Sequence, residues 1–485
     1  MRPFSGDGRD GGIYQIPQGR LTGVHKNITL VTPGEVSGTW TAEGSPYYVD
    51  GHLEIADGET LIIEPGVKVA MRGPYHFTVQ GCVNAEGTED ENIIFTRSNP
   101  NLYWDGFDYV NTPVTNDVSL FDHCIFEYGY GQGIQAALNS GGAFAIKDFD
   151  SVKISNSIFR FNKVEKSGVY PPSGGAIALW TASPVIQKCI FHDNEAEYGG
   201  AIFSYLQAEP IISNCLIYNN TGVRGGAVTF YSLGNGTLIN NTIVDNYASM
   251  YGGGFYLYGG SKPEIINNII WNNQANNAGN QIYNSSFNNL TGYYYNNIEG
   301  GLSGFGGAPF SGPYLFNLDE DPLFSNTPEM PYMLLNSSPC INMGTPDSSA
   351  WYYPQHLPET CLAGNPRILN GRIDMGGYEQ SGILAGDANC DGLVNVLDVV
   401  TIVNYILGNN PEPFCFENAD IDGNGSINVL DVTATINIIT GGKAAPFPGL
   451  KSASAHIYLN PDNITLQSDG TLAGLQFEIY GIKPG

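Results

Sequence analysis

The sequence predicts a mainly β fold, in which a parallel β-helix solenoid is followed by a small α-helical module and then by the start of a β-sandwich. Three observations support this prediction. A short unit of β segments and turns recurs about every 26 residues in the first part of the chain. A loop rich in Asp, Asn and Gly is duplicated further on, and the tail alternates apolar and polar residues. The 62 glycines and 29 prolines among 485 residues fit many short strands and turns.

Two motifs that stay in phase define the first repeat. One ends in asparagine three positions after an apolar residue, and we call it the FxxN motif; the other begins with a Gly-Gly pair. The FxxN motifs are FRFN 159–162, FHDN 191–194, IYNN 217–220, IVDN 243–246 and IWNN 270–273, and the Gly-Gly motifs are GGAF 141–144, GGAI 174–177, GGAI 199–202, GGAV 225–228 and GGGF 252–255. A unit this short cannot bury its apolar side alone, so neighbouring units must stack into a solenoid.

Stacking places equivalent residues of successive coils about 4.8 Å apart, in columns. We expect one column of small stacked residues, which explains three cysteines without a chemical role: Cys124, Ser157, Cys189, Cys215, Asn241 and Asn268. We expect the adjoining column at a bend, where amides hydrogen-bond from coil to coil, and call it the corner column: His123, Asn156, Lys188, Asn214, Asn240 and Asn267.

Less regular strands at 48–96 extend the solenoid upstream. With them, the repeats resemble the right-handed parallel β-helix superfamily, and the paired GGA[I/V] and FxxN motifs are similar to those of polymorphic outer-membrane adhesin passengers. SPCINMG at 338–344 and GNPRILNGRIDMGGYE at 364–379 are similar to the terminal region of exported bacterial β-helix proteins. The resemblance implies a β-helix over 25–384, after a poorly structured segment 1–24. It implies no single activity, because the superfamily includes lyases, hydrolases, adhesins and inert stalks.

A different pattern begins near residue 386. GDANCDGLVNVLDVVTIVNYILG at 386–408 is echoed by ADIDGNGSINVLDVTATINIITG at 419–441. Each copy has oxygen ligands at the spacing of a calcium loop, with a glycine at the sixth position. The side-chain ligands are Asp387, Asn389, Asp391, Asn395 and Asp398 in the first copy and Asp420, Asp422, Asn424, Asn428 and Asp431 in the second, and Leu393 and Ser426 offer backbone carbonyls. Hard oxygen ligands suit Ca²⁺, so the sequence predicts two calcium ions.

The aspartate at the last ligand position, the paired loops and the NVLDV start of each following helix resemble the dockerin type I module, over 385–443. Dockerins bind cohesin domains. The resemblance implies that the residues just before the last ligand face the cohesin: Val396 and Leu397 in one half, and Val429 and Leu430 in the other. Since both halves carry the same pair, it also implies two binding orientations related by a half-turn.

The tail 444–485 contains AGLQFEIYG, which is similar to an early strand of a cohesin-like β-sandwich. The chain stops before such a domain closes, and its beginning lacks the apolar core of a signal peptide. We therefore expect a piece of a longer exported bacterial protein, extracellular or at the cell surface. No apolar run is long enough to span a membrane, and the net charge of −27 argues against nucleic acid as a partner. Export permits disulfides, with Cys340–Cys361 and Cys390–Cys415 as candidate pairs.

Charged residues near the FxxN motifs are the candidates for a catalytic site. Polysaccharide-cleaving β-helices use clustered carboxylates, or calcium with a basic residue, on one outer face. The candidates are Arg160, Lys163, Lys166, His192, Asp193, Glu195, Glu197, Arg224 and Asp245. None forms a family signature, and the Asp122-His123 dipeptide lacks the context found in pectate lyases. The catalytic residues therefore stay unassigned, because charges at solvated corners commonly serve solubility alone.

An aromatic column is the most coherent surface feature. It consists of Trp180, Tyr205, Tyr231 and Tyr258, each four residues after the third residue of a Gly-Gly motif. Ile177 and Leu179 have the opposite parity in their strand and are expected in the core, which directs the aromatic column outward. Aromatic faces stack on sugar rings, so the column predicts binding of an extended glycan. The alternatives are that a loop covers the column or that the parity is reversed.

Together these features predict an exported modular protein whose dockerin attaches a β-helix to a cohesin-bearing assembly or cell surface. The β-helix is expected to act as a glycan-binding or adhesive surface. The alternative is a polysaccharide lyase or glycoside hydrolase of a cellulosome-like complex that catabolises polysaccharide.

Overall fold

The computed structural model describes most of the solenoid and of the double loop. The described residues are 28–131, 140–165, 171–286, 290–325, 327, 330–345, 357–369, 372–380, 385–389 and 394–440, with the backbone of 455–459 and 464–468. The expected N-terminal segment 1–24 lies outside these residues.

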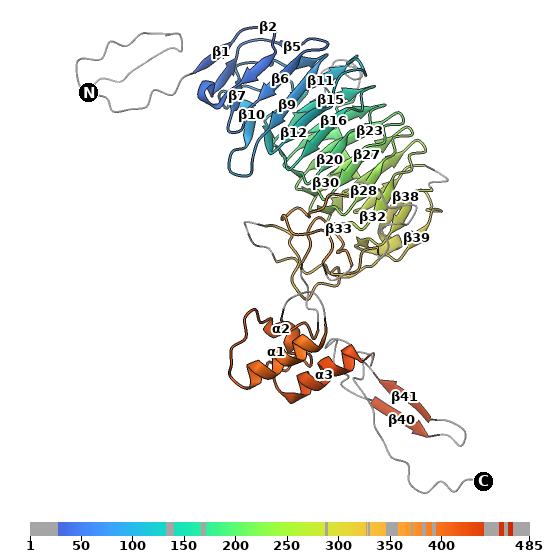
Figure 1. Ribbon diagram of the computed structural model, residues 1–485. Helices are drawn as coiled ribbons and strands as arrows, with labels where there is room; N and C mark the ends of the chain where they lie inside the picture. Colours follow the sequence, from blue (N-terminus) through green and yellow to red (C-terminus); the bar gives the residue numbers. More distant parts are fainter. Residues whose placement is uncertain are drawn as a thin grey trace, which may run out of the picture.

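Three parallel sheets of eleven strands each form a solenoid (Figure 1). Sheet A contains β1 (Thr29–Val31), β4 (Tyr47–Val49), β7 (Lys68–Met71), β10 (Ile93–Arg97), β13 (Cys124–Glu127), β17 (Ile158–Arg160), β21 (Ile190–His192), β25 (Leu216–Tyr218), β29 (Thr242–Val244), β33 (Ile269–Trp271) and β37 (Asn297–Ile298). Sheet B contains β2 (Gly34–Glu35), β5 (Leu53–Ile55), β8 (Phe77–Val79), β11 (Phe107–Val110), β15 (Phe144–Lys147), β19 (Ile177–Trp180), β23 (Ile202–Tyr205), β27 (Val228–Tyr231), β31 (Phe255–Tyr258), β35 (Ile282–Asn284) and β38 (Phe305–Gly307). Sheet C contains β3 (Gly38–Trp40), β6 (Thr60–Ile63), β9 (Cys82–Glu86), β12 (Ser119–Asp122), β16 (Val152–Ser155), β20 (Val185–Gln187), β24 (Ile211–Ser213), β28 (Thr237–Ile239), β32 (Glu264–Ile266), β36 (Gly292–Tyr294) and β39 (Tyr314–Leu315).

A fourth sheet of six strands lies between sheets A and B in the chain order of the repeats. It contains β14 (Tyr130–Gly131), β18 (Lys163–Val164), β22 (Glu195–Tyr198), β26 (Thr221–Arg224), β30 (Tyr247–Tyr251) and β34 (Gln274–Ala275). Each coil adds one strand to sheets A, B and C, six of the coils also add one to the fourth sheet, and equivalent strands of successive coils pair in parallel. The predicted parallel β-helix is therefore confirmed.

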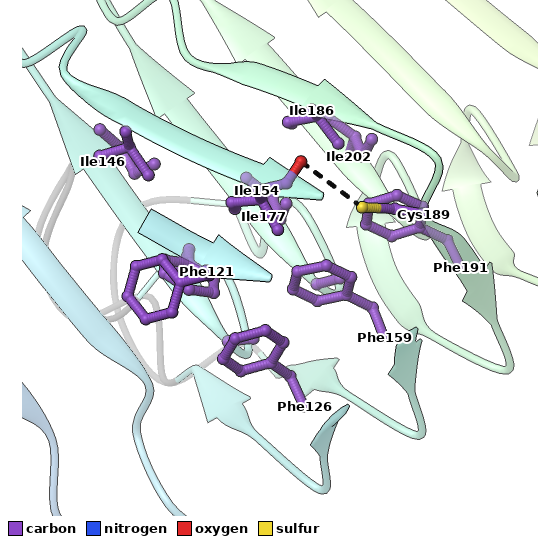
Figure 2. Packing of buried hydrophobic residues seen from close by; sticks show 14 of the residues in the cluster. Phe121, Phe126, Ile146, Ile154, Phe159, Ile177, Ile186, Cys189, Phe191 and Ile202 are labelled. Atoms are coloured by element: carbon purple, nitrogen blue, oxygen red, sulfur yellow. Dashed lines mark hydrogen bonds between the residues drawn. The ribbon is translucent and has the colours of Figure 1, made fainter. Parts of the chain in front are cut away.

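Apolar side chains of alternate strand positions fill the interior of the solenoid. Phenylalanines stack along the axis, with ring centroids 4.8 Å apart for Phe126 and Phe159 and 4.6 Å apart for Phe159 and Phe191 (Figure 2). Cys189 lies beside this stack, and its thiol is 3.7 Å from the carbonyl of Ile154. A stack of identical rings keeps the coils in register, because a slip of one residue would turn every ring outward.

The predicted polar columns are present. All six residues of the corner column have left-handed backbone conformations, with φ between 46° and 56°, and so turn the chain between sheets C and A. In the column of small stacked residues, the backbone N–H of Cys215 donates to Asn241 Oδ1 at 2.9 Å, and Asn241 Nδ2 donates to Asn268 Oδ1 at 2.9 Å. A further buried ladder is formed by the asparagines of the FxxN motifs: Asn162, Asn194, Asn220, Asn246 and Asn273. These amides hydrogen-bond from coil to coil.

Residues 330–345, 357–369 and 372–380 return along the later coils, and we call them the returning segment. Asn240 Nδ2 donates to the carbonyl of Asp374 at 2.8 Å, and Lys188 Nζ donates to Thr360 Oγ1 at 2.9 Å. The buried Arg367 guanidinium lies 3.6 Å from the Glu379 carboxylate and helps to fold the segment on itself. These contacts hold the returning segment against coils that are more than a hundred residues away in the sequence.

Of the two candidate disulfides, Cys340–Cys361 is not formed. Both cysteines are buried and free. The Cys340 sulfur instead accepts a hydrogen bond from Asn297 Nδ2 at 3.1 Å, which directs it toward the last coil. Cys415 is disulfide-bonded, whereas Cys390 lies outside the described residues.

Three helices follow the solenoid: α1 (Val396–Ile406), α2 (Phe416–Ala419) and α3 (Val429–Ile439). None of the helices in the described part of the chain is long and apolar enough to cross a membrane. Beyond them, β40 (Ala455–Leu459) and β41 (Ile464–Ser468) form one antiparallel pair. That pair alone does not support the expected start of a β-sandwich.

Candidate functional site

The second acidic loop brings carboxylates together at the start of α3. Ligand oxygens of Asp420, Asp422 and Asp431 all lie within 4.8 Å of one another. Backbone N–H groups orient two of them: Gly425 donates to Asp420 Oδ2 at 2.8 Å, and Asn424 donates to Asp422 Oδ1 at 3.1 Å. Gly425 has φ of 79°, a conformation that favours glycine and lets the loop turn sharply. The oxygen-only donor set and this compact geometry fit a calcium ion.

Asp431 has a second role, because it also holds the loop to the helix. It is fully buried, and its two carboxylate oxygens accept from the backbone N–H groups of Ile421 and Asn428, both at 2.9 Å. The Asn428 side chain in turn accepts from Leu430 N–H, which completes a capping box at the start of α3. These hydrogen bonds hold the Asp431 carboxylate in place at the start of α3.

The first loop repeats this arrangement where it is described. Buried Asp398 accepts from the backbone N–H groups of Asn389 at 3.1 Å and Asn395 at 2.8 Å, and Asn395 caps α1. Asp387 is also buried. Asp391 and Leu393 lie outside the described residues, so the first ligand set is only partly placed.

The four predicted partner-binding residues form two equivalent exposed apolar pairs. Val396 and Leu397 are 65% and 61% exposed in the first turn of α1, and Val429 and Leu430 are 67% and 65% exposed in the first turn of α3. Each pair lies beside the capping box that holds the last ligand of its loop. Exposed paired leucine and valine side chains contribute nothing to the core, and such apolar surface is typical of a protein contact.

The aromatic column lies on the outer side of sheet B and forms a cup with its neighbours. Trp180, Tyr205, Tyr231 and Tyr258 are in register on four successive strands. Ile177 and Leu179 lie in the main core, whereas Trp180 belongs to a separate outer cluster with Phe203. A cavity of about 230 Å³ opens here, which we call the aromatic cup; it is lined by Pro171, Ser173, Trp180, Tyr198, Phe203, Tyr205 and Tyr231.

The rings do not form the flat, evenly exposed ladder that the sequence suggested. Trp180 is only 6% exposed, because Phe203 and Tyr205 pack against it at angles of 61° and 82°. Tyr231 and Tyr258 stack on each other with centroids 4.3 Å apart, so their facing surfaces are not open to a ligand. Burial raises the pKa of Tyr231 to about 12, so its hydroxyl stays protonated at neutral pH. Binding of a glycan by these rings stays a prediction.

Comparison with known families gives two matches. Residues 114–311 match the model of the right handed beta helix region, and residues 385–440 match the model of the Dockerin type I domain. The chain therefore contains a right-handed β-helix region and a dockerin type I domain. A comparison with curated proteins finds no match.

The dockerin module implies attachment of the β-helix to a cohesin-bearing assembly. Dockerin type I domains generally bind calcium, and the carboxylates of Asp420, Asp422 and Asp431 form an acidic group suited to it. Proteins that carry dockerins are typically extracellular or at the cell surface. The β-helix fits a carbohydrate-active protein.

The charged corner residues of the β-helix are engaged in ion pairs and hydrogen bonds. Arg160 lies 2.7 Å from Glu127, Arg224 lies 3.3 Å from Glu197, and Lys163 bridges Glu195 and Glu165. Nδ1 of His192 lies 2.7 Å from Asp193 Oδ2. Asp245 accepts a hydrogen bond from the Tyr332 hydroxyl of the returning segment at 2.5 Å. Lys166 lies outside the described residues. Among the described candidates, the pairs Arg160–Glu127, Arg224–Glu197 and Lys163–Glu195 link successive coils.

Sequence reasoning missed part of the aromatic cup. Tyr198 comes from β22 in the fourth sheet and packs at 90° to Tyr231, with centroids 5.5 Å apart. The Arg224 guanidinium lies over the ring of Tyr198, 5.2 Å from the ring centroid. The signal was present as an aromatic residue just before a Gly-Gly pair. Its meaning depends on the bend between two sheets, which the repeat pattern does not specify.

Proposed function

We propose that the dockerin anchors this protein to a cohesin outside the cell and that the β-helix then holds a glycan in the aromatic cup. The observation that carries the binding role is the cup itself, an apolar cavity walled by rings from sheet B and the fourth sheet. Sugar rings have apolar faces that pack on aromatic side chains, and tyrosine hydroxyls at the rim supply hydrogen bonds. A cavity of about 230 Å³ is the size of a single sugar unit rather than of a long chain.

The cup and the extended ladder make different predictions for Tyr258. This residue does not line the cup and is 37% exposed. We expect Tyr205→Leu to weaken glycan binding, because Tyr205 is a wall of the cup. Tyr258→Leu should leave binding nearly unchanged. Isothermal titration of oligosaccharides selected on a glycan array measures both variants. Equal losses would support the ladder instead, and no glycan bound by the unmodified chain would reject the binding role.

The docking role is tested on the two apolar pairs. Each pair is proposed to contact the cohesin in one of two orientations. Changing Val429 and Leu430 to aspartate should therefore preserve binding through the first half, and changing all four residues should abolish it, because the contact would bury charge. Leu302→Asp is a matched control, since Leu302 is 49% exposed on the β-helix. Loss of binding from one pair alone would show a single orientation.

The same preparation tests the alternative of a polysaccharide lyase or glycoside hydrolase. A pure binding protein releases neither reducing sugar nor unsaturated uronate from a panel of polysaccharides. If the unmodified chain releases either product and Tyr205→Leu does not, the aromatic cup is a substrate site rather than a binding site alone.

A further inference from the structure

The rings of the aromatic cup meet at steep angles and so bound its space from several sides. Trp180 makes angles of 61° with Phe203 and 82° with Tyr205, and Tyr198 lies at 90° to Tyr231. A planar group of a ligand lies flat against one orientation of ring only. A compact, rounded group contacts all the walls at once. The shape of the cup therefore favours a rounded group over a planar one.

The cup offers few hydrogen-bonding groups. Its two lining residues without rings are Pro171 and Ser173, and the Ser173 hydroxyl already donates to the Pro171 carbonyl at 2.9 Å. The other polar side-chain atoms of the lining are the tyrosine hydroxyls and the Trp180 N–H. A ligand group that is rich in donors loses its hydrogen bonds to water on entering such a site, and this loss weakens binding. A group without donors or acceptors has no such cost.

The lining is uncharged, but the faces of its rings are electron-rich. None of the described residues that line the cup carries a charge. The Arg224 guanidinium lies over Tyr198, and its charge is offset by the Glu197 carboxylate at 3.3 Å. A cation within about 6 Å of the centroid of a Trp, Tyr or Phe ring is attracted by the negative face of that ring. The net charge of −27 adds a general attraction for cations.

We propose that the aromatic cup binds a quaternary ammonium group, such as the trimethylammonium group of choline. Such a group is rounded, carries its charge on methyl groups that contact several rings, and has no N–H to leave unpaired. A primary ammonium has three N–H donors, which this lining does not satisfy. The proposal rests on the binding role of the cup and names the group that enters it. That group is either a free small molecule or a substituent on a glycan.

The test compares choline with 3,3-dimethyl-1-butanol, which has the same shape but a carbon in place of the charged nitrogen. Isothermal titration calorimetry of the full chain measures both ligands and the primary amine ethanolamine. We expect choline to bind at least about tenfold more tightly than either, because cation–π attraction adds to apolar contact only when the ligand is charged and methylated. Equal affinities for choline and 3,3-dimethyl-1-butanol, tighter binding of ethanolamine, or no binding of choline would overturn the proposal. This comparison needs no variant.

Two variants place the binding in the cup. Tyr205→Leu removes a wall and should weaken choline binding about tenfold, whereas Tyr205→Phe keeps the ring face and should retain it. Tyr258→Leu is the matched control, because Tyr258 does not line the cup and is 37% exposed. Circular dichroism checks that each variant is folded. Equal losses in Tyr205→Leu and Tyr258→Leu would overturn the assignment to the cup.

Competition separates this proposal from the glycan-binding role. If a neutral oligosaccharide binds and choline does not displace it, the glycan role stands and the ammonium site is rejected. If choline binds and no unsubstituted oligosaccharide does, the ammonium site stands and binding of unsubstituted glycans is rejected. An oligosaccharide that carries a choline substituent then identifies the source: tighter binding than free choline indicates the substituted glycan, and equal binding indicates the free small molecule.

Discussion

Replacing Asp431 with asparagine separates its role in calcium binding from its role in folding. In the folded module both carboxylate oxygens accept backbone N–H groups, from Ile421 and Asn428. An asparagine has one acceptor oxygen, so one of these buried donors loses its partner and faces an NH₂ group instead. An unpaired buried donor costs about 1–3 kcal/mol. We therefore expect Asp431→Asn to destabilise α3 by about that amount even without calcium.

The same substitution removes a carboxylate from the acidic group. Loss of a partner outside the direct ligand set commonly costs about 10–100-fold in metal affinity, and loss of a ligand should cost at least as much. Asp422→Asn is the matched variant, because exposed Asp422 belongs to the same acidic group but does not cap a helix. We expect it to weaken calcium binding without changing the stability of the calcium-free module.

Hydrogen exchange of peptides that cover α1 and α3 measures both effects in the full chain, with calcium and with a chelator. Asp431→Asn should exchange faster in α3 under both conditions, and Asp422→Asn only when calcium is present in limiting amount. Asp398→Asn should make α1 exchange faster under both conditions, because Asp398 makes the equivalent hydrogen bonds at the start of α1. The capping argument would be refuted if, with chelator present in both samples, α3 were protected equally in Asp431→Asn and in the unmodified chain.

Three further expectations concern folding. Chelation of calcium should lower the protection of α1 and α3 and leave the β-helix sheets unchanged, because metal-binding energy is folding energy in such loops; equal exchange with and without chelator would contradict this. Asn220→Ala should lower the thermal unfolding temperature of the β-helix far more than Asn219→Gly, since Asn220 is fully buried in the FxxN ladder and Asn219 is an exposed left-handed residue; equal shifts would reject a stabilising ladder. Burial raises the pKa of Asp105 to about 6, so its contribution to stability is present below about pH 4 and is lost as the pH rises through 6. Asp105→Asn should therefore stabilise the protein at pH 7.5 and not at pH 4, as denaturant titration at both pH values would show.

The solenoid could be predicted because its information is local and repeated. A step of about 26 residues sets the coil, and the left-handed corner needs one residue whose side chain tolerates positive φ, which Asn219 and Asn240 illustrate. The calcium loops were predictable for a similar reason, since their ligand spacing lies within a dozen residues. The helix starts at Val396 and Val429 follow from the asparagine caps just before them.

The cup geometry could not be read from the repeat. Alternation within a strand places Trp180 on the outer side of sheet B, but it gives no ring angle and no neighbour from another sheet. Phe203 and Tyr205 pack against Trp180, and Tyr198 reaches Phe203 from the fourth sheet across the bend to sheet B. The Cys340–Cys361 pairing failed for a related reason, since spacing along the chain says nothing about where the Cys340 sulfur points.

The packing of the returning segment on the corner column shows most clearly what a repeat leaves open. Its key contact joins Lys188 to Thr360 across 172 residues, and the next corner residue, Asn214, reaches the same threonine across 146. Within the repeat, Lys188 is only an irregular member of an amide column. In the fold, Lys188 and Asn214 both hydrogen-bond to Thr360 of the returning segment. Function in a solenoid is thus expected where the repeat is broken, because residues that only stack coil on coil gain nothing from departing from the common pattern.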